Sequence, residues 1–200
     1  MFSLFKKKLD ITYGYDDVTL IPQYSELDSR ISTDVSMNGY YLPIIGSCMS
    51  TLGTDMMKTL SLSNIPFVCH RAFKTGEEQF NYFFPNGSFE KLDCRSANCI
   101  WFAIGSVKKY QDWIDFLLSK GVRRFCVDMA HGDSEACIST IKYLKEELNH
   151  LEKSSKIKIQ TSHIIAGNVA TVEGFKRLQK AGADGIRVGI ASGQICSTAI

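Results

Sequence analysis

The chain has 200 residues and a formal net charge of +2, which is enough length for one domain with a sizeable core. Because basic and acidic residues nearly balance, no global basic field favours binding to nucleic acid. The apolar stretches around the lysine run at residues 6–8 are too short for a signal peptide or a membrane span. We therefore expect a cytoplasmic protein with neither a nucleic-acid nor a membrane partner.

We expect residues 1–41 to form an N-terminal segment. From residue 42 onward, short apolar runs alternate with helical patterns. We expect strands over residues 42–46, 65–69, 100–104, 124–128, 163–167 and 184–189. We expect helices over residues 55–63, 75–84, 107–119, 134–151 and 171–181, with an irregular stretch over 85–98. Strands with helical crossovers at near-regular intervals predict an α/β fold, in which helices cover a parallel sheet.

The periodicity leaves two architectures open, a closed (β/α)8 barrel and an open doubly wound sheet. No Gly-x-Gly-x-x-Gly motif follows the first predicted strand, so nothing favours a dinucleotide-binding doubly wound domain. In both architectures, catalytic groups collect at the carboxyl ends of the strands. Polar loops are expected there at residues 47–50, 70–71, 128–134, 167–168 and 189–198. The polar residues of each loop alone have a purely structural explanation, but five such loops on one edge of the sheet favour a functional site.

Seven cysteines are spread along the chain without Cys-x-x-Cys pairs or the Cys/His spacing of a zinc site. Their odd number argues against a complete set of internal disulfides, so we expect free thiols in a reducing compartment. They are Cys48, Cys69, Cys94, Cys99, Cys126, Cys137 and Cys196. We expect most of them to be buried apolar residues and only Cys196 to be chemically active.

Residues 183–198 are the stretch with the strongest chemical signal. They begin as a short strand, an apolar run interrupted only by Arg187, and continue as a loop rich in glycine and serine. Gly189 and Gly193 allow backbone angles that turn amides and carbonyls toward a ligand. Cys196 follows them, where a thiolate could attack an electron-poor carbon held by this loop.

The same stretch resembles the active-site cysteine loop of the IMP dehydrogenase/GMP reductase family, Gly-Ala-Asp-x-x-x-Val-Gly-x-Gly-x-Gly-Ser-x-Cys-x-Thr. Four other segments resemble family signatures in the right order: Tyr15-Asp16-Asp17-Val18-Thr19-Leu20-Ile21-Pro22, residues 43–53, residues 127–135 and Ile165-Ala166-Gly167-Asn168-Val169-Ala170-Thr171. The resemblance covers almost the whole chain, from about residue 13 to residue 198.

This resemblance implies a TIM (β/α)8 barrel that is incomplete here, with about six of eight β/α units. Residues 42–200 would form the partial catalytic barrel, and residues 1–41 would wrap beneath it. A complete barrel needs about 250 residues, so we expect either a fragment or a truncated or split gene product. The chain would assemble into a homotetramer if the barrel is complete. Otherwise its partner would be a separately encoded remainder of the barrel.

The family chemistry implies an NAD(P)-dependent oxidoreductase in which a cysteine thiolate adds to C2 of a purine nucleotide. Cys196 matches the nucleophile and Thr198 a proton-transfer partner, while Asp128, Asn168 and His131 match positions that bind the cofactor, NADPH or NAD. Ser47, Met49, Gly193 and Gln194 match the pocket for the nucleotide, GMP or IMP. The backbone carbonyls of Gly189, Ala191, Gly193 and Cys196 match those that hold a potassium ion.

Two activities within the family remain open. Regulatory nucleotide-binding modules are inserted into many IMP dehydrogenases, whereas residues 85–99 leave room only for a loop. That layout favours GMP reductase, which reduces GMP to IMP with NADPH. The segments 70–71, 130–132 and 194–196 are closer to dehydrogenases, which oxidise IMP to XMP with NAD.

A third interpretation is a truncated, non-catalytic barrel that acts as a subunit or binding module. Ala191 stands where the family has glycine, and Gln194 stands where it has a phosphate-binding serine. A methyl group restricts the backbone, and glutamine is longer than serine, so both departures are compatible with relaxed catalytic demands. Retention of Cys196 and Asp128 favours an enzyme.

Overall fold

A computed structural model describes residues 17, 19, 21–36, 40, 42–154 and 160–190. Residues 34–190 form one compact unit. The described residues before position 34 belong to a separate unit, in which the 3-10 helix η2 (Arg30–Ser32) is assigned. The sequence boundary at residue 41 stays a prediction.

Within the described residues of this compact unit, the strands form one five-stranded parallel sheet in the order β1-β2-β3-β4-β5. The strands are β1 (Phe67–Cys69), β2 (Ile100–Ile104), β3 (Arg124–Asp128), β4 (His163–Val169) and β5 (Gly185–Val188). Each strand therefore lies beside its predecessor in the chain. A doubly wound sheet would reverse its order at a switch point, whereas a barrel keeps chain order. The fold is a parallel β/α barrel of which the chain contains part.

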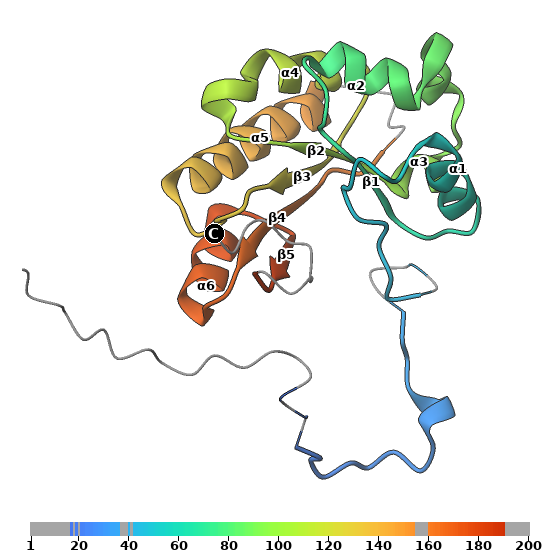
Figure 1. The fold of residues 1–200 in the computed structure, drawn as a ribbon, viewed down its shortest axis with the longest axis vertical. Coiled ribbons are helices and arrows are strands. Elements are labelled where there is room, and N and C mark those ends of the chain that lie inside the picture. The colour runs from blue at the N-terminus through green and yellow to red at the C-terminus, as the bar shows by residue number, and fades with distance from the viewer. Residues whose placement is uncertain are drawn as a thin grey trace, which may run out of the picture. The chain divides into compact units, whose positions relative to one another are not determined.

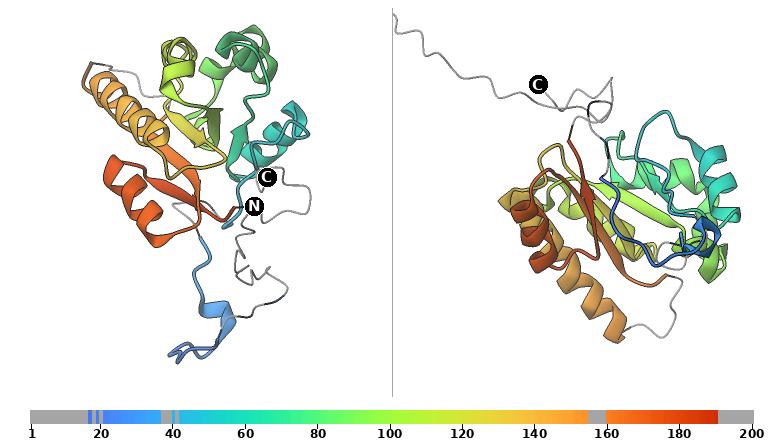
Figure 2. Two further views of the ribbon diagram at one scale, coloured as in Figure 1. Left: turned by 60° about the vertical axis from the view of Figure 1, so that its left-hand side comes forward. Right: turned by 90° about the horizontal axis from the view of Figure 1, so that it is seen from below.

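Figure 1 shows the helices following the strands in turn, and Figure 2 shows from two more directions that they gather on one side of the sheet. The helical segments are α1 (Thr54–Leu62), α2 (Gly76–Phe83), η3 (Pro85–Lys91), α3 (Cys94–Asn98), α4 (Val107–Ser119), α5 (Glu135–Ser154) and α6 (Val172–Ala181). One-sided helices agree with a barrel, whose other sheet face points inward. Among the described helices, none is long and apolar enough to cross a membrane.

The two faces of the sheet carry different side chains, because successive residues of a strand point to opposite sides. The helix-covered face holds large apolar groups such as Phe102 and Phe125, both fully buried in the main core. The opposite face holds a second, smaller cluster that includes Trp101 and Cys126. We call this second surface the inner face, since it corresponds to the interior of a barrel.

The strand predicted over residues 42–46 is reduced to a single bridge, in which Gly46 pairs with Phe67 of β1. Gly46 N donates to Pro66 O at 2.8 Å, and Val68 N donates to Gly46 O at 3.0 Å. Pro43 and Pro66 have no N–H, so the two segments lack donors on which a longer ladder depends. Pro66 also delays the start of the next strand, which begins at Phe67 instead of residue 65.

The stretch over residues 85–98, expected to be irregular, contains η3 and α3. Asp93 supplies the missing start signal, because its Oδ1 accepts from Ser96 N at 2.7 Å and so caps α3. The helices predicted over residues 75–84 and 171–181 are confirmed as α2 and α6. Thr75 caps α2 by accepting from Glu78 N at 3.1 Å, and Gly182 ends α6 in the left-handed conformation with φ 108°.

Candidate active site

The carboxyl edge of the sheet brings three chain-distant residues into one row. Asp128 is the last residue of β3 and is the register partner of Gly167 on β4, which in turn pairs with Arg187 on β5. Side chains at paired positions point to the same face of a sheet. The row therefore places Asp128 and Arg187 together on the inner face, on either side of a glycine that leaves room between them.

Asp128 is held by two arginines. Arg187 Nη1 donates to Asp128 Oδ1 at 2.7 Å, and Arg71 Nε lies 3.5 Å from Asp128 Oδ2. Arg71 Nη2 also donates to the backbone oxygen of Asp128 at 3.1 Å, while its Nη1 donates to Tyr110 Oη at 3.0 Å. The carboxylate side chain keeps a quarter of its surface exposed. Since a carboxylate has about four acceptor positions, Asp128 can still accept from a ligand hydroxyl.

Asn168 ties the ends of three segments together. Its Nδ2 donates to Gly189 O at 2.8 Å, its backbone oxygen accepts from Gly132 N at 2.7 Å, and its N donates to Met129 O at 2.9 Å. A Cβ at Gly132 would lie 2.8 Å from Asn168 O, so glycine is required for this close approach. The side chain of Asn168 thus fixes the backbone at Gly189, just after β5.

The segment after the Gly46 bridge reaches the same place. Arg187 Nη1 donates to Cys48 Sγ at 3.5 Å, so residues 47–49 lie close to β5 although they are far from it in the sequence. Ser47 and Met49 are exposed on either side of the half-buried Cys48. Both side chains are therefore accessible, and their place in the nucleotide pocket stays a prediction.

A cavity of about 400 Å³ opens on the inner face. Arg187, Cys48 and Cys126 contribute to its wall, together with Trp101 and His163. Nearby, the buried Arg124 guanidinium stacks on Trp101 at 4.8 Å and donates to Tyr40 Oη at 2.6 Å. Because burial disfavours charge, the pKa of Arg124 is lowered, and burial raises the pKa of Tyr40 to about 12.

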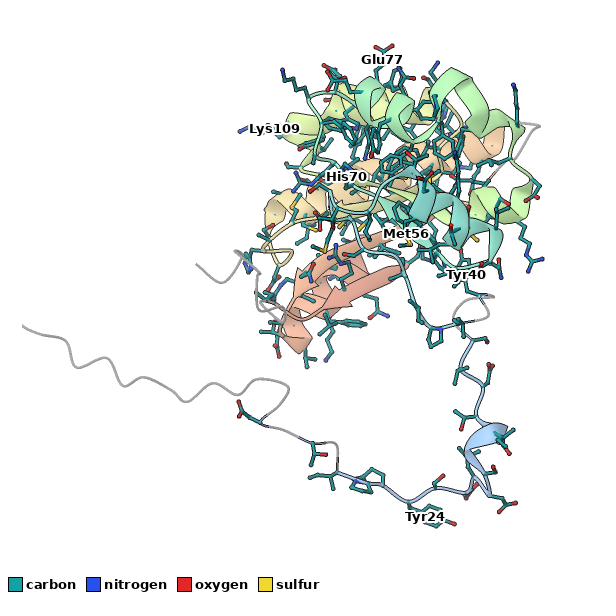
Figure 3. All side chains as sticks on the ribbon, turned by 45° about the vertical axis from the view of Figure 1, so that its right-hand side comes forward. Tyr24, Tyr40, Met56, His70, Glu77 and Lys109 are labelled. Carbon is teal, nitrogen blue, oxygen red and sulfur yellow. The ribbon has the colours of Figure 1, made fainter. Side chains whose placement is uncertain are left out.

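The two predicted histidine-bearing loops differ. His131 lies exposed on the loop after β3, which Ser134 Oγ anchors by donating to His131 O at 3.1 Å. His70 lies inside the unit, whereas Glu77 and Lys109 lie on its helical surface (Figure 3). The His70 ring stacks on Phe73 at 4.8 Å and its Nδ1 accepts from Ala72 N at 3.3 Å. Burial lowers the pKa of His70, and these contacts give it a structural role.

Sequence reasoning missed the two arginines. Arg187 is the only interruption of the apolar run in the last predicted strand, and a charge inside a buried strand is a signal that it has a partner. Arg71 is the second residue after β1, at an edge already expected to be functional. Five predicted site residues lie outside the described residues: Ala191, Gly193, Gln194, Cys196 and Thr198.

Candidate ion ligands are few in the described part of the chain. No group of three or more His, Cys, Asp or Glu side chains there could hold a metal ion. Of the carbonyls predicted to bind potassium, that of Gly189 is described, and it accepts from Asn168. A carbonyl oxygen has two lone pairs, so one remains for a cation.

These features define the class of protein: a parallel β/α barrel whose polar groups gather at the carboxyl ends of its strands, as in enzymes with this fold. Residues 12–200 match the family model described as the IMP dehydrogenase / GMP reductase domain. The chain belongs to this family of purine nucleotide oxidoreductases.

Individual relatives agree with that assignment. The chain is 29% identical over 196 residues to a GMP reductase of Staphylococcus aureus (strain JH9), covering 94% of this chain and 54% of the relative. It is 28% identical over 195 residues to a GMP reductase of Streptococcus pneumoniae (strain CGSP14), covering 94% and 53%. A crystal structure of inosine 5′-monophosphate dehydrogenase from Legionella pneumophila matches with a TM-score of 0.66 and 28% identity, covering 92% of this chain and 53% of that one. The chain spans about half the length of these relatives.

Proposed function

We propose that this chain acts in the NADPH-dependent reduction of GMP to IMP, through a covalent bond between Cys196 and C2 of the purine. The observation that carries the proposal is the carboxyl edge, where Arg187 binds Asp128 and Asn168 binds Gly189 just before the chain continues to Cys196. Family membership supports a purine nucleotide as the substrate. We also propose a cytoplasmic location and a homotetramer, on the basis of the sequence and its resemblance to the family.

The proposed roles divide the residues between nucleotide and cofactor. Cys196 attacks C2 as a thiolate, and the 2-amino group leaves as ammonia. Thr198 assists proton transfer at the same centre. Ser47 and Met49 line the nucleotide pocket, since both are exposed beside the half-buried Cys48. The loop residues Gly193 and Gln194 would contact the phosphate.

The cofactor site draws on the row of paired residues. A bound nicotinamide cofactor supplies the hydride for C2. Asp128 would accept a hydrogen bond from a ribose hydroxyl, because its carboxylate has acceptor positions left after pairing with Arg187. Asn168 would orient the reacting centre, with its own position fixed by Gly189. His131 follows Asp128 closely in the sequence, so it would contact the cofactor from the exposed loop after β3.

One structural feature favours GMP reductase over IMP dehydrogenase. Between α2 and β2 the chain is occupied by η3 and α3, which leave no place for inserted regulatory modules. The second candidate, NAD-dependent oxidation of IMP to XMP, is favoured by the similarity to the Legionella enzyme. A potassium ion held by Gly189, Ala191, Gly193 and Cys196 would belong with this activity.

Purified full chain should be assayed with GMP plus NADPH and, separately, with IMP plus NAD, following the reduced cofactor by absorbance. We expect activity with GMP that Cys196→Ser abolishes and that Ser197→Ala, a change in the same loop, retains. Activity with IMP alone would favour the dehydrogenase. Binding of GMP in a calorimeter without either reaction would favour the non-catalytic binding module, and absence of binding and activity would contradict all nucleotide roles.

A further inference from the structure

We propose that Cys48 and Cys126 form a redox-sensitive pair, in which a peroxide oxidises Cys48 and Cys126 then joins it in a disulfide. The two cysteines are free thiols and are contributed by segments far apart in the sequence. They were expected to be inert, and neither takes part in the proposed reaction. Their arrangement around one arginine indicates a second chemical site.

The geometry brings both sulfur atoms to the same cation. Arg187 Nη1 lies 3.5 Å from Cys48 Sγ and 3.6 Å from Cys126 Sγ. The two side chains are also close enough to shift each other's pKa. Both line the cavity of about 400 Å³ on the inner face. A small oxidant that enters this cavity therefore meets two thiols side by side.

The two thiols differ in a way that assigns their roles. Cys48 is half-buried, whereas Cys126 is fully buried. The interaction with Cys126 lowers the pKa of Cys48, an effect that Arg187 adds to, while burial and Asp128 oppose it. The interaction with Cys48 and burial raise the pKa of Cys126 well above its usual value. Cys48 is thus the thiol that ionises more readily and is the better nucleophile, and Cys126 is its resolving partner.

The chemistry balances with a peroxide as the oxidant. The Cys48 thiolate attacks one peroxide oxygen, so that an S–O bond forms, the O–O bond breaks, and hydroxide leaves and becomes water on protonation. Cys126 sulfur then attacks the sulfenic sulfur of Cys48. The S–S bond forms, the S–O bond breaks, and the departing hydroxide takes the Cys126 proton as a second water. Two thiols lose two electrons, and the peroxide gains them.

The disulfide would also change the neighbouring site. It removes the sulfur partners of Arg187 Nη1, whose remaining partner is Asp128, and it draws Cys48 toward β3. Ser47 and Met49 flank Cys48 and would move with it. We expect weaker GMP binding after oxidation, a consequence that, unlike the disulfide itself, rests on the proposed function.

The test treats the full chain with hydrogen peroxide, blocks remaining thiols and maps peptides by mass spectrometry without reduction. We expect a peptide linking Cys48 to Cys126, with the loss of two hydrogen atoms, about 2 Da. In Cys126→Ser, dimedone should label Cys48 as a sulfenic acid. Cys137 is the matched reference thiol, because burial raises its pKa to about 11. Cys48 should react with iodoacetamide at least about 10-fold faster than Cys137.

Several results would overturn the proposal. Cys48 that stays reduced, or that pairs with a different cysteine, contradicts it, as does a Cys48 no more reactive than Cys137. If Cys126→Ser fails to fold, mapping of the wild-type chain alone decides the question. The readout is a covalent bond and needs no enzymatic activity, so failure of the proposed function would leave it standing.

Discussion

Replacing Gln79 with methionine should destabilise the fold, because it leaves several buried polar groups without a partner. Gln79 is fully buried on α2. Its Nε2 donates to His70 O at 2.9 Å, to Ala103 O at 3.0 Å and to Cys69 O at 3.3 Å, and its Oε1 accepts from Trp113 Nε1 at 2.8 Å. This one amide therefore connects the carboxyl ends of β1 and β2 to α4.

Methionine fills a similar volume but offers no donor and only a weak acceptor, so Trp113 Nε1 and the carbonyls lose their partner. An unsatisfied buried polar group costs about 1–3 kcal/mol, and we expect the free energy of unfolding to fall by about 3 kcal/mol in total. For a chain of this size that corresponds to a melting temperature lower by roughly 6–12 °C. Asn81→Met replaces an exposed amide of the same helix and should change stability by less than about 0.5 kcal/mol.

Urea unfolding followed by circular dichroism measures both variants. The reasoning is refuted if Gln79→Met unfolds at the same urea concentration as Asn81→Met. It is also refuted if Gln79→Met loses stability only through a changed urea dependence, because that would place the effect in the unfolded state.

Three other predictions follow from the same contacts. Gly132→Ala places a Cβ 2.8 Å from Asn168 O and should cost about 1–3 kcal/mol in urea unfolding, more than Gly53→Ala, whose Cβ meets only the Tyr82 hydroxyl. Arg187→Met breaks the partly buried ion pair with Asp128, so it should lower the free energy of unfolding by about 1–2 kcal/mol and slow the alkylation of Cys48. Arg177→Met breaks an exposed ion pair with Asp133 and should lower it by about 0–1 kcal/mol. Equal losses of stability in the two variants would contradict this prediction. Burial lowers the pKa of His163 below its usual 6.5, so the unfolded chain takes up a proton at higher pH than the folded chain does, and stability should fall as pH drops below about 6.5. His163→Gln should make this pH dependence of stability less steep, and His70 should account for the part that remains. An unchanged pH dependence in His163→Gln would contradict the prediction.

The strands were predictable because their residues form apolar runs that two layers of the protein bury. Five of the six predicted strands appear within a few residues of the expected bounds. The strand over residues 42–46 was wrong as a full strand, because hydrophobicity does not register the missing donors of Pro43 and Pro66. Helices η3 and α3 were missed because their stretch has no clear apolar period, although Asp93 offered a capping signal.

The candidate site was predictable only in part. Sequence reasoning placed Asp128 and Asn168 on one edge because parallel strands end there together. It could not find the pairing of Asp128 with Arg187, which depends on strand order and register. The Cys48–Cys126 pair was equally hidden, since its members meet only when the segment after Gly46 crosses the inner face near β3.

The most direct test of the proposed function is the alkylation rate of Cys196 in the full chain, followed by peptide mapping at increasing GMP concentration. A nucleotide held with C2 against the thiolate must shield it from iodoacetamide. We predict rapid, stoichiometric labelling that GMP suppresses in a saturable manner, with labelling of the buried Cys137 slow and unaffected. Labelling of Cys196 that is indifferent to both GMP and IMP would contradict the account.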